Sequence, residues 1–252
     1  MPDTRHPPET VFSLRLLAPA LADWAPPEQP FDPEGAWTLR YRLFSTQGKK
    51  PWGGAGNLEI TREPGPDRLR LEFRHQIHAR GRHHFETRVD AILPPNTLPA
   101  DSWSWTLRSR LIRAGETVPE TLAEKSGRVE NGSIHLRTGP TRRVHSAPPP
   151  VLAPWLLFEL LQKPSTTDTL DLTFTSLYEF EEPQPDQSVR FRKRTTLALP
   201  AADGEPVPFD VFEHVGAGQV PRVYWRDNAG RIAIAASGIM ATLLDTQESI
   251  PS

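Results

Sequence analysis

The stretch SAPPPVLAPWLLFELLQKP, residues Ser146–Pro164, decides the fold of this chain. Prolines frame it, and nearly every position between Trp155 and Leu161 is apolar. A helix on a protein surface has one apolar face, whereas a helix that is apolar all round is buried on every side. Proline is tolerated in the first turn of a helix but cannot continue one, so Pro164 ends the segment. The stretch therefore predicts one short helix, near residues 151–163, that other elements enclose.

The sequence on either side of this segment alternates between apolar and polar residues. A period of two is typical of antiparallel strands that bury one face. The alternation is clear in the ranges 37–44, 69–74, 85–91, 103–107, 170–180, 189–197 and 207–212. Asn131-Gly132 predicts a tight hairpin, and Asp227–Gly230 predicts the turn of a final hairpin, in whose last strand Gly238 indicates a bulge. We therefore expect about ten strands, without an internal repeat.

One short helix cannot cover a flat sheet of about ten strands, so the sheet must curl until its concave side encloses the helix. The sequence thus predicts a mainly β fold, in which a curled antiparallel sheet forms a half-open β-barrel around the helix. A β-sandwich is the alternative, with the proline-rich segment as a crossover between two layers. We expect residues 37–245 to form a single β domain, with an N-terminal extension over 1–36 and a tail over 246–252.

The composition excludes several classes of function. A net charge of −2 provides no basic field for nucleic acid or an anionic membrane. The absence of cysteine excludes disulfides, thiol nucleophiles and zinc sites built on thiolates. No apolar run is long enough to span a bilayer, and Arg15 interrupts Val11–Ala25, which is not typical of a retained signal peptide. We expect no cofactor, no nucleic-acid partner and no membrane span, and the sequence identifies no protein partner.

Four of the eight histidines lie in RHQIHARGRHHFE, residues Arg74–Glu86. A hairpin that turns at residues 80–82 brings the apolar faces of its two strands together in one register only, because a slip of one residue exchanges the faces. That register places Ala79 opposite His83, Ile77 opposite Phe85, His75 opposite Thr87 and His78 opposite His84. The histidines then lie two on each face, which excludes a single four-ligand metal shell.

The outward pair, His78 and His84, provides with Glu86 the only weak candidates for a metal site, since imidazole and carboxylate are suitable ligands. We favour two exposed histidines near a turn and predict no metal. The inward His75 is the best candidate for a catalytic acid or base, with Tyr41 or Tyr178 as its partner.

Seven tryptophans and the inward faces of the strands indicate either a large core or a cavity lined by aromatic rings. In the second case, the side chains expected to line the cavity are Leu71, Phe73, His75, Trp103, Trp105, Trp155, Phe158, Phe174 and Tyr178.

Three segments carry a resemblance to known proteins: WTLRYRLF at 37–44, PPPVLAPWLLFELLQKP at 148–164, and PRVYWRDNAGRIAIAASGIMATLLD at 221–245. With them the chain resembles bacterial envelope proteins of the DUF3108 type and, more distantly, is similar to the lipoprotein carriers LolA and LolB. The resemblance implies a curled sheet over an apolar cavity and a place in the bacterial cell envelope.

Three functions are consistent with this sequence. The first is a non-enzymatic binding protein that holds a lipid or another hydrophobic molecule inside the curled sheet. The second is a calycin-type enzyme that acts on a small apolar substrate with His75 as acid or base. The third is a cavity-free structural or interaction domain. The size of the internal cavity distinguishes the first from the third, and a carboxylate bonded to His75 would favour the second.

Overall fold

The computed structural model describes residues 14–47, 50–78, 83–95, 98–166, 169–199, 205–238 and 240–249. The described helices are α1 (Leu14–Leu21) and α2 (Leu156–Gln162), with 3-10 turns η2 (Pro119–Thr121) and η3 (Pro164–Thr166). The strands are β1 (Trp37–Gln47), β2 (Lys50–Pro64), β3 (Leu69–His78), β4 (His83–Leu93), β5 (Ser102–Arg113), β6 (Glu116–Thr117), β7 (Ala123–Glu130), β8 (Ser133–Thr138), β9 (Thr141–Ser146), β10 (Val151–Leu152), β11 (Asp171–Tyr178), β12 (Glu182–Ala198), β13 (Pro206–Val215), β14 (Arg222–Asp227), β15 (Ile232–Ser237) and β16 (Met240–Ser249).

All sixteen strands belong to one sheet. Strand β10 lies at one edge, followed by β11–β16, then β1–β5, then β7–β9 at the other edge. The short β6 lies off this path and pairs with β5. Neighbouring strands are antiparallel except β10 and β11, which are parallel. The pairing of β16 with β1 joins the two halves of the chain in the middle of the sheet. This single sheet confirms the predicted curled architecture and not the sandwich alternative.

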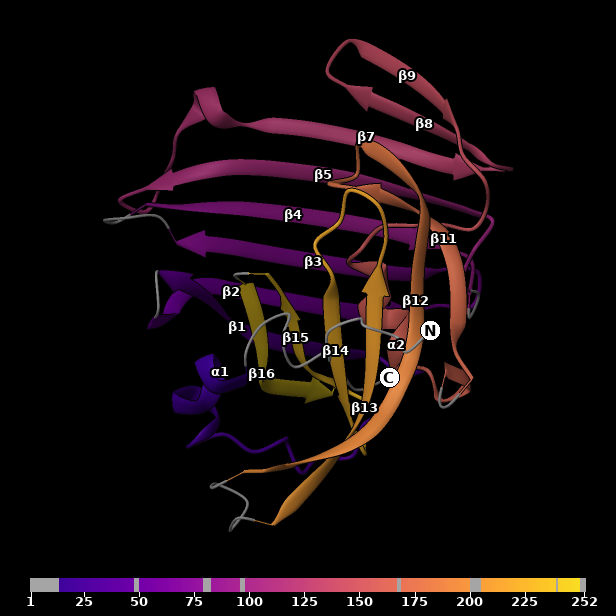
Figure 1. The fold of residues 1–252 in the computed structure, drawn as a ribbon. Helices are drawn as coiled ribbons and strands as arrows, with labels where there is room; N and C mark the ends of the chain where they lie inside the picture. The colour runs from indigo at the N-terminus through magenta and orange to yellow at the C-terminus, as the bar shows by residue number, and fades with distance from the viewer. Residues whose placement is uncertain are drawn as a thin grey trace.

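The two ends of the sheet curl toward each other. Figure 1 shows the orange strands β11–β13 crossing in front of the magenta strands β3–β7. Trp103 on β5 donates its indole N–H to the carbonyl of Val151 on β10, at 2.9 Å. Lys125 on β7 forms an ion pair with Glu181, just after β11. These contacts connect strands far apart in the sheet order, so the sheet approaches a barrel.

The described residues form sixteen strands, whereas alternation predicted about ten. Two of the additional strands, β6 and β10, contain two residues each, which is too short to show any period. Strand β9 is largely exposed and therefore has no apolar face to recognise.

The C-terminal segment forms three strands, and the predicted bulge at Gly238 is wrong. Gly238 has φ +55° and follows the last residue of β15. Ser237 pairs with Met240, the first residue of β16. The glycine thus provides the left-handed backbone of a hairpin turn, which a sequence pattern alone does not distinguish from a bulge.

Helix α2 is buried at every residue, as predicted. The ring of Phe158 packs edge-on against Tyr41 of β1 and Tyr224 of β14, with ring centroids 5.3 and 5.7 Å apart. Strands from both halves of the sheet therefore contact the same helix. No helix in the described part of the chain is long and apolar enough to cross a membrane.

Buried arginines hold α2 in place. Arg62 of β2 is 0% exposed and donates its Nε–H to the carboxylate of Glu159, which is 1% exposed, at 3.0 Å. Arg226 of β14 donates to the carbonyls of Leu161 and Lys163, at 2.9 and 3.0 Å, at the end of the helix where backbone acceptors lack intrahelical partners. These bonds anchor α2 to the sheet, and moving the helix would separate the buried charges of Arg62 and Glu159.

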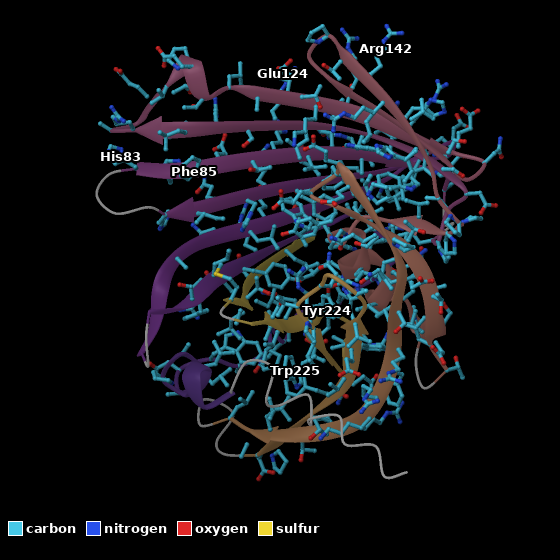
Figure 2. The ribbon with its side chains drawn as sticks, turned by 45° about the horizontal axis from the view of Figure 1, so that its top comes forward. His83, Phe85, Glu124, Arg142, Tyr224 and Trp225 are labelled. Carbon is cyan, nitrogen blue, oxygen red and sulfur yellow. The ribbon has the colours of Figure 1, made fainter. Side chains whose placement is uncertain are left out.

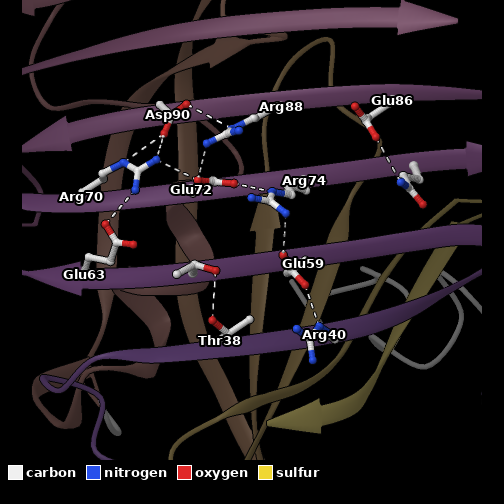
Figure 3. Close-up of polar contacts among 12 residues, drawn as sticks. Thr38, Arg40, Glu59, Glu63, Arg70, Glu72, Arg74, Glu86, Arg88 and Asp90 are labelled. Carbon is white, nitrogen blue, oxygen red and sulfur yellow. Dashed lines mark hydrogen bonds and ion pairs between the residues drawn. The ribbon is translucent and has the colours of Figure 1, made fainter. Parts of the chain in front are cut away.

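The convex face of β1–β4 carries cross-strand ion pairs (Figure 3). Glu72 accepts from Arg70 and Arg88, at 2.8 and 2.7 Å, and Arg40 pairs with Glu59 at 2.6 Å. Such pairs, in which the arginine is partly exposed, each contribute about 0–1 kcal/mol and mark a solvated surface. The strands therefore turn their polar side outward, and their apolar side faces the interior.

Candidate ligand-binding cavity

Two hollows lie on the concave side of the sheet beside Trp155, the residue before α2. The larger has a volume of about 420 Å³ and the smaller about 310 Å³. Both are bordered by His75, Ile77, Trp155 and Arg222, so they are two lobes of one cavity. We call the larger the polar lobe and the smaller the apolar lobe.

The apolar lobe lies between the middle of the sheet and α2. Leu43 of β1 and Leu58 of β2 border it from the sheet, and Phe158 borders it from α2. The opposite wall is formed by small side chains of β15 and β16, among them Ala235, which pairs with Thr242. The small side chains leave space that larger residues would fill, and this space is the lobe.

The polar lobe lies between the two halves of the sheet, and several of its lining residues are polar or charged. These residues are Thr87, Ser109, Lys125, Glu179, His214 and Gln219. The mouth of the cavity carries exposed apolar residues. Ile77 and Tyr178 are each 39% exposed, and Val220 is 58% exposed. The cavity therefore has an apolar rim and one polar wall.

Two histidines of the polar lobe are neutral at neutral pH. Burial, with a smaller contribution from the positive charge of Arg222, lowers the pKa of His75 to about 4. The same two causes, burial first, lower the pKa of His214 to about 4. His214 is 2% exposed, and its Nε2 atom has no hydrogen-bond partner among the described residues. A buried polar atom without a partner costs about 1–3 kcal/mol.

Arg222, the first residue of β14, lies where the two lobes meet. Within the described ranges, no carboxylate lies within 4.0 Å of its guanidinium, unlike those of Arg62 and Arg231, which pair with Glu159 and Asp227. Lys125, the other cation of the polar lobe, is paired with Glu181. The cavity thus contains a positive charge that no described side chain neutralises directly.

Four of the nine side chains predicted to line the cavity border it: His75, Trp155, Phe158 and Tyr178. The other five are packed elsewhere in the core and border neither lobe: Leu71, Phe73, Trp103, Trp105 and Phe174. Alternation identifies the inward face of a strand, but not which inward side chains reach an open space. Figure 2 shows Tyr224 inside the curl and Phe85 near the start of β4.

Sequence reasoning missed Arg222 and His214. A signal for Arg222 exists in RVYWRD, because Arg222, Tyr224 and Arg226 alternate and Tyr224 and Arg226 contact α2. Charged residues on the inward face of a buried strand indicate a structural or functional requirement. His214 lies in PVPFDVFEHV and carries no such signal.

The histidine hairpin has the predicted register where it is described. Ile77 pairs with Phe85, His75 with Thr87, and His78 with His84. Ala79 and the turn at residues 80–82 lie outside the described residues.

The outward histidines contact each other and the backbone and, within the described ranges, are not placed as metal ligands. The rings of His78 and His84 are 6.2 Å apart, and His78 contacts the carbonyl of Gly54 at 2.9 Å. Glu86 accepts from Arg110 at 2.8 Å. Among the residues that the structure describes, no three His, Asp or Glu side chains are placed to hold a metal ion together.

His75 has aromatic rather than acidic neighbours. Its ring packs edge-on against Trp155, with centroids 5.4 Å apart. No hydrogen bond joins His75 to a carboxylate in the described ranges, so no acidic group orients the imidazole as in a catalytic dyad. Tyr41 lies deeper, against Phe158, and borders neither lobe.

Comparisons with known proteins agree with the fold. No family model matches the chain, and neither does any curated protein. Among solved structures, the chain is similar to the crystal structure of a beta-barrel-like protein of the domain of unknown function DUF1849 from Brucella abortus. The TM-score is 0.56 at 9% identity, over 86% of this chain and 98% of that chain. At this identity the likeness shows a β-barrel-like fold alone, and it does not extend to the DUF3108 or LolA types.

Proposed function

We propose that this chain is a non-enzymatic binding protein that holds a lipid or another hydrophobic small molecule in the two-lobed cavity. One observation carries the proposal: a curled sheet and a fixed helix leave adjoining hollows of about 310 and 420 Å³. Ligand sites of this kind occupy roughly 300–1,000 Å³ and are lined mainly by apolar and aromatic side chains. A cavity-free domain would have no such space.

Burial of alkyl surface would drive binding. An acyl chain that buries roughly 300 Å² contributes about 7 kcal/mol at about 25 cal/mol per Å², before the costs of ordering. The exposed Ile77, Tyr178 and Val220 at the mouth provide apolar contacts for a chain that enters.

Titration of the protein with a fluorescent fatty acid tests the proposal, and the indole of Trp155 reports on both lobes. Micromolar binding with a change in tryptophan emission is expected. Native mass spectrometry of protein purified from its own host is the second measurement. Protein that carries no lipid and also fails to bind the added fatty acid would overturn the proposal.

A larger side chain in the apolar lobe should compete with the ligand. Ala235→Leu places three more carbon atoms in the hollow, and we expect binding of the fluorescent fatty acid to weaken at least about tenfold. Ala198→Leu is the matched control, because Ala198 is an exposed residue of β12 outside both lobes. Equal affinities for the two variants, with both folded by circular dichroism, would place the ligand elsewhere.

A further inference from the structure

The two lobes differ in polarity, and their junction carries a charge. Hydroxyl, amide and imidazole groups border the polar lobe, including Ser109, Gln219 and His214. Leu43, Leu58 and Phe158 border the apolar lobe. A ligand that is polar at one end and apolar at the other would match the two lobes.

Arg222 favours a negative charge at the polar end of the ligand. Arg222 borders both lobes and forms no ion pair with a described carboxylate. An arginine presents five N–H donors in a planar fork that matches a carboxylate. An anion at this place would gain charge-assisted hydrogen bonds with the one cation of the lobe that has no described acidic partner.

His214 provides the second, independent observation. Its ring is held against Phe174, with centroids 5.3 Å apart. The residue borders the polar lobe, and its buried Nε2 has no hydrogen-bond partner among the described residues. A buried polar atom without a partner in the protein calls for an explanation, such as a bound water or another polar group at the site. A headgroup oxygen is one group that would satisfy this nitrogen.

The charged groups around Arg222 restrict the headgroup to a single negative charge. Lys125 is already paired with Glu181. Glu179 also borders the polar lobe and would repel an anion. His75 and His214 are neutral near pH 7 and add no positive charge. One arginine therefore compensates a monoanion such as a carboxylate better than a phosphate with nearly two charges.

We propose that the cavity binds a single-chain amphiphile with a carboxylate head, such as a fatty acid, whose head meets Arg222 and His214 and whose alkyl chain fills the apolar lobe. This inference rests on the proposed function and specifies its substrate class. It assigns Arg222 as the residue that recognises the head.

The experiment is calorimetric titration of the full chain at pH 7 with dodecanoate, dodecan-1-ol and dodecyltrimethylammonium, all below their aggregation concentrations. Wild-type protein should bind dodecanoate about 10–100-fold more tightly than the alcohol, since a hydrogen-bonded charge contributes that much. The cationic amphiphile should bind most weakly. Arg222→Met should lose the preference for dodecanoate and keep the affinity for the alcohol.

Matched controls separate the effect of the Arg222 charge on binding from an effect of the substitution on folding. Arg108→Met removes an arginine of the convex face that pairs with Glu124, and it should leave all three affinities unchanged. Arg222→Lys keeps the charge without the planar fork and should fall between wild type and Arg222→Met. If Arg222→Met does not fold, the wild-type ranking of the three heads and the lysine variant decide the question.

A magnetic resonance measurement tests the second contact. Dodecanoate should shift the imidazole signals of His214, and the alcohol should shift them less. Alcohol and dodecanoate binding with equal affinity to wild type, with Arg222→Met unchanged, would overturn the carboxylate assignment alone. Absence of binding by all three amphiphiles would overturn the proposed function itself.

Discussion

Replacement of Arg62 by methionine is expected to lower the free energy of unfolding by about 3–5 kcal/mol, the usual cost of removing one partner of a buried ion pair. Arg62 is fully buried and joins β2 to Glu159 of α2 at 3.0 Å. It also donates to the backbone carbonyls of Glu34 and Gly35, the latter at 2.7 Å. Its loss removes the donor that the Glu159 carboxylate and these carbonyls have in Arg62.

The pKa of Glu159 determines how the variant behaves with pH. Burial raises the pKa of this carboxyl, and Arg62 opposes the rise. Without the arginine the pKa should rise further above its unfolded value. The Arg62→Met variant should therefore lose stability as pH increases above the usual pKa of a glutamate carboxyl, because the folded state must then release a proton that it holds.

Urea denaturation at pH 7 measures the effect. Arg108→Met is the control, since it breaks the exposed pair with Glu124, 72% and 59% exposed, and should cost less than about 1 kcal/mol. The double variant Arg62→Met/Glu159→Leu should recover part of the loss, because it removes the uncompensated carboxylate. A loss below about 1 kcal/mol for Arg62→Met would show that α2 is not held as described.

Acidification from pH 7 to pH 4 should destabilise the protein through His75 and His214. Each has a pKa of about 4 in the folded state, compared with 6.5 for an unperturbed histidine. The unfolded chain therefore binds protons that the folded protein does not. The stability contribution is fully present above pH 6.5 and is lost as pH falls toward 4, by up to about 3 kcal/mol for each histidine at about 1.36 kcal/mol per pKa unit.

Single substitutions isolate each contribution. His214→Phe keeps a ring against Phe174 and removes both the titrating group and the unpartnered nitrogen. Its free energy of unfolding should match or exceed that of wild type at pH 7. Between pH 6.5 and 4, the free energy of unfolding of His214→Phe should fall by up to about 3 kcal/mol less than that of wild type. The lowered pKa of the buried histidines would be contradicted if wild type and His214→Phe lost stability in parallel, or if magnetic resonance found both histidines titrating near pH 6.5.

The local register of the sheet could be predicted because period two leaves little choice. In the pairing of β3 with β4, a slip of one residue would turn Phe73 and Ile77 outward, so His78 must face His84. The buried helix could be predicted for a similar reason, since an all-apolar segment between prolines has no solvated face. These features depend on neighbours in the sequence.

The cavity depends on side chains that are distant in the sequence. Phe180, at φ +56° just after β11, places its ring 6.4 Å from Trp103, 6.0 Å from Trp105 and 6.2 Å from Trp155, which closes one part of the interior. Ala235 leaves another part open. The sequence pattern does not say which of them fills the space, because that depends on the volume of side chains on opposite walls.

The central claim is that the hollow between the curled sheet and α2 is the place where an alkyl chain binds. The most direct measurement is photo-crosslinking with a fatty acid that carries a diazirine at the middle of its chain, followed by peptide mapping. The account predicts labelling of Trp155 or Phe158 and of β15, competed by unlabelled fatty acid. Binding in this hollow would be contradicted by labelling confined to the convex face of β2–β5, or by labelling that unlabelled fatty acid does not reduce.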